Sequence, residues 1–160
     1  MAVIEFARNV CGIDGANSTE FDKSTKNPVI DILPEQKKIE GLGGNMRLGG
    51  KDVELKPGTL AAKLFDNAAT IRLRFRHRYE VDPKYIKTLE EHGMIFSGKH
   101  PKQPIMQILE LSQEMHPYFV GTQAHPELTS RPLRPSPLFL GFCRAALSYA
   151  DAKVRQPQVV

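Results

Sequence analysis

The chain has 160 residues, 41% of them hydrophobic and 25% charged, and this composition is ordinary for one soluble globular domain. Its formal net charge of +4 is a mild excess that indicates solubility and some affinity for anions rather than nucleic-acid binding. No apolar run approaches the roughly 20 residues needed to cross a bilayer, and Glu5 and Arg8 interrupt the apolar N-terminus, so neither a membrane span nor a signal peptide is expected.

The first segment, residues 1–11, is predicted to be a helix because Val3, Phe6, Ala7 and Val10 recur at helical spacing. No capping residue precedes it, although helices usually begin with a Ser, Thr, Asp or Asn whose side chain satisfies an orphan amide. The pattern therefore starts in mid-element, and we expect an upstream strand and turn to be missing.

The next segments alternate between loop and regular structure. Residues 12–27 are rich in turn formers and predict a loop, whereas the β-branched run at residues 28–33 predicts a strand. The glycine-dense residues 41–50 do not match G-x-G-x-x-G and are interpreted as a turn or mobile lid. Residues 59–67 are predicted to form a short helix capped by Thr59.

Residues 71–81 carry the clearest pattern in the chain. The odd positions are apolar or aromatic, and the even positions are Arg72, Arg74, Arg76, Arg78 and Glu80. Strict alternation predicts one strand with an apolar face and a strongly cationic face, and His77 on the apolar side is interpreted as a packed residue. Pro83 is predicted to start a helix that reaches about His92.

The rest of the chain mixes strands and helices. Strands are predicted at residues 94–97, 105–111 and 118–123, and a helix at residues 137–150. This mixture indicates an α/β or α+β fold, and the helix at the start of the chain fits α/β better. We expect residues 1–150 to form one domain and residues 151–160 a tail.

The two cysteines, Cys11 and Cys143, do not form a C-x-x-C pair. Neither a disulfide framework nor a metal site is therefore expected, and a reducing, cytoplasmic compartment suits such a chain. Both thiols are interpreted as small buried apolar residues.

His125 and Glu127 are the first candidates for chemistry, at the end of a predicted strand. In extended backbone, residues two apart project to the same side, and Pro126 restricts the backbone between them. A carboxylate beside an imidazole holds one tautomer and stabilises the imidazolium, which is the base half of a nucleophilic triad. The alternative is that His125 only ends a strand and Glu127 faces solvent.

The arginine face of residues 71–81 is the second candidate. A guanidinium group is suited to binding a carboxylate or a phosphate. For Arg72 and Arg74 the preferred interpretation is a solvated strand face.

Five short strings occur together and in order along the chain: residues 16–21 (ANSTEF), 43–49 (GGNMRLG), 76–81 (RHRYEV), 123–127 (QAHPE) and 130–139 (SRP followed by PSPLF). Together they resemble the glutaminase domain of the CTP synthase family, within the class I glutamine amidotransferases. The resemblance runs from Ala2 to about Ala150. It implies a partial α/β, flavodoxin-like domain that lacks the N-terminal strands and the nucleophile turn.

The resemblance also implies roles for four residues. His125 and Glu127 would be the histidine and glutamate of a Cys-His-Glu triad. Glu20 would bind the α-amino group of L-glutamine, and Arg78 its α-carboxylate. Residues 43–49 would form a conformationally active loop near the site.

The resemblance implies no cofactor for this segment. The parent enzyme, which is cytoplasmic and homo-oligomeric, would use ATP and Mg²⁺ in a synthetase domain that converts UTP to CTP. That domain would be the partner of this segment and would receive its ammonia. No nucleic-acid or membrane partner is implied.

In this family the nucleophilic cysteine lies in a G-x-C-L-G-M-Q turn directly before the helix that here begins at Ala2, and that turn is absent. Cys11 is roughly 13–15 Å further along the helix at 1.5 Å per residue, too far to replace it. We therefore expect the chain alone not to hydrolyse glutamine. Two alternatives remain: a non-catalytic glutamine-binding or regulatory module, and an anion- or nucleic-acid-binding protein. Against the second alternative, the sequence lacks a basic patch with interleaved aromatic residues, which nucleic-acid binding would require.

Overall fold

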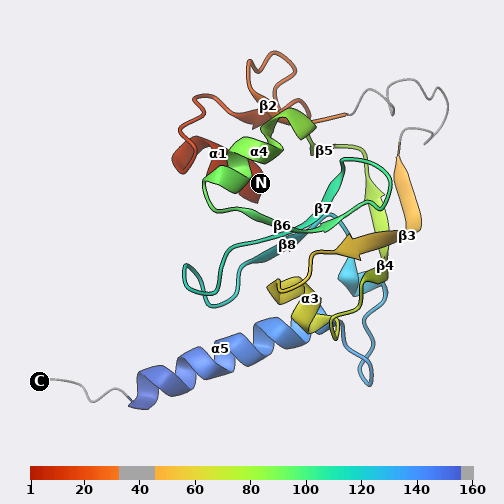
Figure 1. Ribbon diagram of the computed structural model, residues 1–160, viewed down its shortest axis with the longest axis vertical. Coiled ribbons are helices and arrows are strands. Elements are labelled where there is room, and N and C mark those ends of the chain that lie inside the picture. Colours follow the sequence, from red (N-terminus) through yellow and green to blue (C-terminus); the bar gives the residue numbers. More distant parts are fainter. Residues whose placement is uncertain (33–45, 156–160) are drawn as a thin grey trace, which may run out of the picture.

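The computed structural model describes residues 1–32 and 46–155, and within them the strands form two sheets (Figure 1). In the smaller sheet, β1 (Asn17–Ser18) is parallel to β2 (Pro28–Asp31), which is antiparallel to β5 (Glu80–Val81). The larger sheet has five strands, every neighbouring pair antiparallel, in the order β4 (Thr70–His77), β3 (Arg47–Leu55), β6 (Ile95–Lys99), β7 (Met106–Glu110) and β8 (Val120–Thr122).

Helices lie on both sides of the larger sheet, which confirms the α/β class (Figure 1). On one side are α1 (Ala2–Asn9) and α4 (Pro83–Glu91), and on the other are α3 (Leu60–Leu64) and the long α5 (Pro137–Arg155). A short 3₁₀ turn, η1, spans Pro126–Leu128. No helix in the described part of the chain is both long and apolar enough to cross a membrane.

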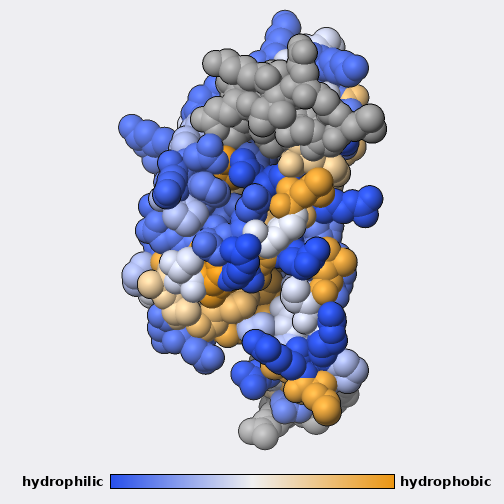
Figure 2. All heavy atoms as spheres, turned by 90° about the vertical axis from the view of Figure 1, so that its right-hand side faces the viewer, coloured by the Kyte–Doolittle hydropathy of each residue, from blue (hydrophilic) through white to orange (hydrophobic). Residues whose placement is uncertain are grey.

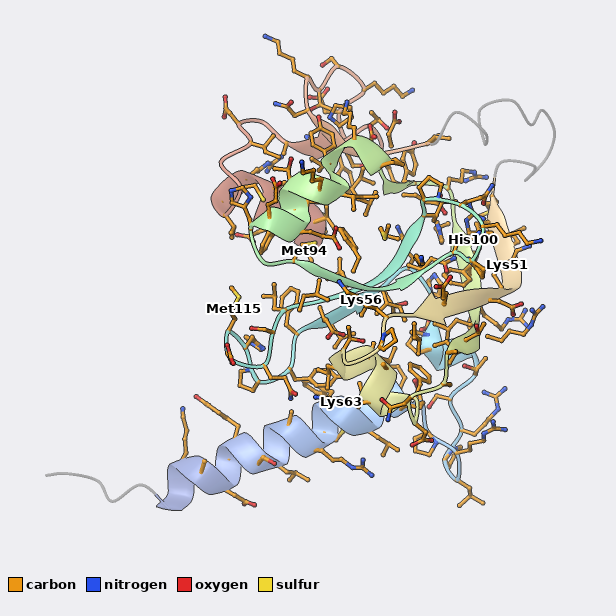
Figure 3. The ribbon with its side chains drawn as sticks, in the orientation of Figure 1. Lys51, Lys56, Lys63, Met94, His100 and Met115 are labelled. Atoms are coloured by element: carbon orange, nitrogen blue, oxygen red, sulfur yellow. The ribbon has the colours of Figure 1, made fainter. Side chains whose placement is uncertain are left out.

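Two apolar clusters fill the spaces between these layers. The first lies under α1 and α4, where Met94 is seen beside β6 (Figure 3), and its largest members are Phe6, Leu89, Met94 and Phe96. The second lies between α3 and the sheet and includes Val53, Phe75, Ile108 and Ala124. The helix predicted at residues 1–11 is confirmed, because α1 buries its periodic apolar face.

The caps of the short helices follow the sequence prediction. Thr59 accepts a hydrogen bond from the Ala62 amide at 3.2 Å, and Asp82 accepts one from the Lys84 amide at 3.0 Å, directly before Pro83. Each cap satisfies one of the amides that a helix N-terminus leaves without an intrahelical partner.

The glycine-dense stretch was only partly interpreted correctly. Residues 41–45 lie outside the described residues, but Arg47–Gly50 belong to β3 and pair with β4, so a turn or lid is the wrong interpretation for them. Gly49 has a φ of 78°, which a side chain would strain. At Gly50 a Cβ would lie 2.9 Å from Arg72 Nε, so the missing side chain leaves room for this arginine.

The strand predicted over residues 71–81 is broken. Alternation holds through His77, with Leu73 and Phe75 buried, but the chain bends at Arg78 and Tyr79, and Glu80–Val81 join the smaller sheet as β5. The break follows from Glu80, which is completely buried although it occupies a position predicted to face solvent. The bend therefore passes the chain from one sheet to the other.

The last helix, α5, extends away from the sheet (Figure 1). It continues to Arg155, into the segment predicted from the sequence to be a tail. Phe142, Leu147 and Tyr149 on it are exposed. Cys143 is exposed as well, so its interpretation as a buried residue was wrong.

Candidate functional site

A pocket of about 440 Å³ opens between the N-terminal end of α1, the bend after β4, and strands β7 and β8. Apolar side chains such as Val3, Phe96 and Leu109 form part of its lining. Its polar lining includes Ser18, Glu20, Arg78, Tyr79, Gln107 and Gln123. The pocket thus joins an apolar floor to a few convergent polar groups, as ligand sites do.

Glu20 and Arg78, both candidates from the sequence, line this same pocket although they are far apart in the chain. Glu20 follows β1, and its amide donates a 3.1 Å hydrogen bond to the hydroxyl of buried Ser18. Arg78 stands at the bend between β4 and β5. The pocket is therefore lined by one anionic and one cationic side chain.

Glu80 fixes the bend from inside the protein. Its carboxylate accepts hydrogen bonds from Arg47 Nε at 2.5 Å and from His77 Nε2 at 2.8 Å. Burial acts to raise the pKa of Glu80, but the hydrogen bonds from His77 and Arg47 and the positive charge of Arg47 outweigh it, and the pKa lies below its usual value. The carboxylate is therefore charged and ties β3, β4 and β5 together beside Arg78.

Gln123 also connects the bend to β8. Its Nε2 donates to the carbonyl oxygen of Tyr79 at 3.3 Å, and its backbone amide donates to the carbonyl of Gln107 on β7 at 3.0 Å. These bonds hold the last strand of the sheet against the wall of the pocket.

His125 and Glu127 form the predicted pair, with 2.7 Å between Nδ1 and Oε1. The backbone between them is not extended, because Pro126 opens the 3₁₀ turn η1, and the turn brings the side chains together. The His125 amide donates to the carbonyl of Arg74 at 2.9 Å, which anchors the pair to β4.

The pair is accessible to solvent, with 39% of the His125 side chain and 56% of the Glu127 side chain exposed. A hydrogen bond with its own backbone amide, and then the one with His125, lowers the pKa of Glu127. Neither residue lines the pocket, but Gln123, two positions before His125, does.

Neither cysteine lines the pocket. Cys11 follows the C-terminal end of α1, where its amide donates to the Phe6 carbonyl at 3.0 Å, whereas the pocket meets the opposite end of this helix. Burial raises the pKa of the Cys11 thiol, and the negative end of a helix dipole disfavours a thiolate further.

The sequence interpretation missed Gln107, which is only 1% exposed and lines the pocket. Within the described part of the chain, neither its Oε1 nor its Nε2 has a hydrogen-bond partner. A polar residue between Met106 and Ile108, in a predicted strand whose other residues are mostly apolar, was the signal that could have revealed it.

A second, more open hollow lies beside β3, where Lys51 and His100 are neighbours (Figure 3). Burial lowers the pKa of His100, and the positive charges of Arg47, Lys51 and Lys102 lower it further, against an opposing effect of Glu80. The face that carries β3 and β4 is mainly hydrophilic, with smaller apolar patches (Figure 2). Among the residues described, no group of three or more His, Cys, Asp or Glu side chains could hold a metal ion.

Comparison with known proteins defines the class to which this fold and site belong. The family model "Glutamine amidotransferase class-I" matches residues 1–145, so the chain belongs to the class-I glutamine amidotransferase family.

The similar curated proteins are CTP synthases, and the match corresponds to their glutaminase portion. The chain is 55% identical to the CTP synthase of Archaeoglobus fulgidus over 93% of its own length and 27% of that protein's. It is 56% identical to the CTP synthase of Methanocaldococcus jannaschii over 91% of its length and 26% of that protein's. The chain thus spans about a quarter of these relatives.

A solved structure gives the same assignment. The glutaminase domain of the Trypanosoma brucei CTPS, with bound acivicin, superimposes with a TM-score of 0.81 at 33% sequence identity. The match covers 92% of this chain and 56% of that one. The family and the fold implied by the sequence motifs are therefore confirmed.

Proposed function

We propose that this chain provides the glutamine-binding part of a CTP synthase glutaminase domain. In this proposal Glu20 binds the α-ammonium group of L-glutamine and Arg78 its α-carboxylate, since each offers the opposite charge. The main support is that both residues, far apart in the chain, line one pocket. The acivicin bound to the similar Trypanosoma brucei domain agrees with a small-molecule site in this fold.

His125 and Glu127 are proposed as the base and its orienting carboxylate. If the Nδ1–H of His125 donates to Glu127, Nε2 is left with a lone pair that can take a proton from a thiol. The charged carboxylate then stabilises the imidazolium that forms. This step requires a nucleophilic cysteine, and neither Cys11 nor Cys143 lies in the pocket lining.

We accordingly propose that the activity requires residues outside this chain. Those residues would supply the thiol, and a synthetase domain would use ATP and Mg²⁺ to convert UTP to CTP with the released ammonia. This chain itself needs no cofactor in the proposal. We also propose that the parent enzyme is cytoplasmic and homo-oligomeric.

The decisive test is L-glutamine binding to the purified chain, measured by calorimetry. Binding should weaken at least tenfold in Arg78→Met and in Glu20→Gln, because each variant loses one charge-assisted hydrogen bond. Arg74→Met, which removes an exposed charge from strand β4 just before the bend and outside the pocket, is the matched control and should bind like the wild type. Wild-type protein that fails to bind L-glutamine would rule out the proposed ligand.

A second candidate, a non-catalytic glutamine-binding or regulatory module, is favoured by the absence of both cysteines from the pocket lining. Ammonia release separates the two. A catalytic part should become active when the cysteine-bearing remainder of such a domain is added, and this activity should be lost in His125→Ala. A regulatory module should bind L-glutamine and remain inactive under both conditions.

A further inference from the structure

The buried carboxamide of Gln107 is not explained by the roles proposed for the four site residues. Its side chain is almost fully buried, yet neither polar atom of its carboxamide has a hydrogen-bond partner within the described residues. Leaving a buried polar group without a partner is destabilising, and native proteins rarely do so without a functional reason. Because Gln107 lines the pocket, a ligand bound there is a candidate partner for both atoms.

His77 adds a second atom of the same kind. This ring also lines the pocket, and its buried Nδ1 has no partner in the described part of the chain. Its Nε2 faces the Glu80 carboxylate at 2.8 Å, and a carboxylate can only accept. Nε2 therefore carries the hydrogen, so that Nδ1 is an acceptor in the neutral ring.

These groups complete a set that fits one kind of ligand. Among the residues that line the pocket, Gln107 Oε1 and His77 Nδ1 add two acceptors to the Glu20 carboxylate, and Gln107 Nε2 adds a donor to the Arg78 guanidinium. An α-ammonium group has three hydrogens to donate, and an adjacent carboxylate has lone pairs to accept them.

We infer that Gln107 is a further ligand-binding residue of this pocket, where its carboxamide bridges the α-ammonium and α-carboxylate groups of a bound α-amino acid. The inference rests on the proposed function, since L-glutamine is the amino acid in question. It assigns Gln107 to the head group, so that the side-chain amide of the ligand remains available for reaction. Selectivity for the complete zwitterion follows, because an analogue without the amino group leaves the carbonyl of Gln107 unpaired.

Gln107→Leu tests this inference because the variant keeps the size and removes both polar atoms. The unliganded variant should be more stable than the wild type, by about 2–4 °C in Tm if roughly 1 kcal/mol of unmet hydrogen bonding is removed. L-glutamine binding should weaken ten- to a hundredfold, as expected for lost hydrogen bonds to charged groups. Gln113→Leu, at an exposed position outside the pocket, is the matched control.

The ligand series gives an independent readout. The wild type should bind L-glutamine more tightly than glutaramic acid, which lacks the α-amino group, and the preference should shrink in Gln107→Leu. If the variant does not fold, the side-chain amide protons of Gln107 in the wild type must shift in NMR spectra when L-glutamine is added, while those of Gln113 stay in place.

Each result has a clear meaning. A lower Tm for Gln107→Leu would show that the amide is satisfied in the free protein, and unchanged affinity or an unmoved amide signal would show that it does not meet the ligand; either overturns the inference and leaves the proposed function intact. If the wild type does not bind L-glutamine, the proposed function fails, and this inference fails with it.

Discussion

Arg47 and Glu80, 33 positions apart in the chain, form an ion pair that is almost entirely inside the protein, with 13% of the arginine side chain and none of the glutamate side chain exposed. Through this pair the first residue of β3 is fastened to β5, directly after the bend that carries Arg78. The described part of the GGNMRLG motif, residues 46–49, is thus joined to the RHRYE motif.

The first prediction concerns the strength of this pair. Arg47→Met should lower the free energy of unfolding by about 3 kcal/mol, because it leaves the buried Glu80 carboxylate without its main cation. Arg72→Met is the control, since the Arg72–Asp52 pair is mostly exposed and should be worth less than about 1 kcal/mol. Urea denaturation measures both values, and equal losses would contradict the importance of the buried pair.

The second prediction is a pH dependence. The pKa of Glu80 is lowered in the folded state, so the stabilisation from its charge is present above the ordinary value of 4.5 and is lost as the pH falls through the lower folded value. The Tm difference between wild type and Glu80→Gln should therefore be large at neutral pH and shrink below about pH 4.5. Glu91→Gln, which alters an exposed pair with Lys87, should show no such trend.

The third prediction concerns Glu110, which is 2% exposed and caps α3 with both oxygens. These oxygens accept from the Leu60 and Ala61 amides at 2.7 and 2.9 Å. Glu110→Gln should cost about 1–3 kcal/mol of stability, because an amide can accept at only one of its two ends and carries no charge for the helix N-terminus. Glu90→Gln at an exposed position of α4 is the control, and a similar loss there would refute this explanation.

The fourth prediction concerns the attachment of α5. A Cβ on Gly141 would lie 2.6 Å from Leu64 Cδ2 and 2.8 Å from Tyr118 Cε2, so Gly141→Ala forces the helix away from α3. The expected loss is about 1–3 kcal/mol, the usual cost of overpacking. Ser148→Ala on an exposed turn of the same helix should leave the Tm within about 1 °C of the wild type or raise it slightly.

The fifth prediction concerns the tautomer of His125. The Glu127 carboxylate accepts a hydrogen from Nδ1 of the neutral ring, so Glu127→Ala should shift the ring toward the Nε2–H form. Nitrogen chemical shifts of the imidazole report this change directly. The exposed ring of His116 should keep its spectrum, and an unaltered His125 spectrum in the variant would show that the carboxylate does not hold the ring.

Periodicity was enough to predict most of the elements. The helical spacing of residues 1–11 and the alternation of residues 71–77 both reflect side chains that are buried on one face, and burial is what hydrophobic patterning records. The caps at Thr59 and Asp82 follow equally local rules. The four candidate site residues come from motifs; in the structure Glu20 and Arg78 line one pocket, and His125 lies beside Glu127.

The misses arise where distant contacts override local pattern. Arg47–Gly50 form a strand despite their glycines because β4 supplies a complete partner edge. Glu80 is buried against the alternation because Arg47 and His77 compensate its charge, and no local rule contains that information. The environment of Gln107 could not be judged from the sequence, since the absence of a hydrogen-bond partner among the described residues is a property of the folded pocket.

Because the chain passes between the sheets at Arg78 and Tyr79, residues of both sheets line the pocket. This arrangement affects how the pocket can open and close. Local unfolding of either sheet would destroy the pocket. A bound ligand therefore raises the free energy of local unfolding of each sheet by its full binding free energy. Amides of the short strands β1 and β2, which have few bonds of their own, should then exchange their hydrogens with solvent as slowly as those of β7 when the ligand is saturating. Occupancy of one small cavity would thus make the two sheets exchange as a single cooperative unit.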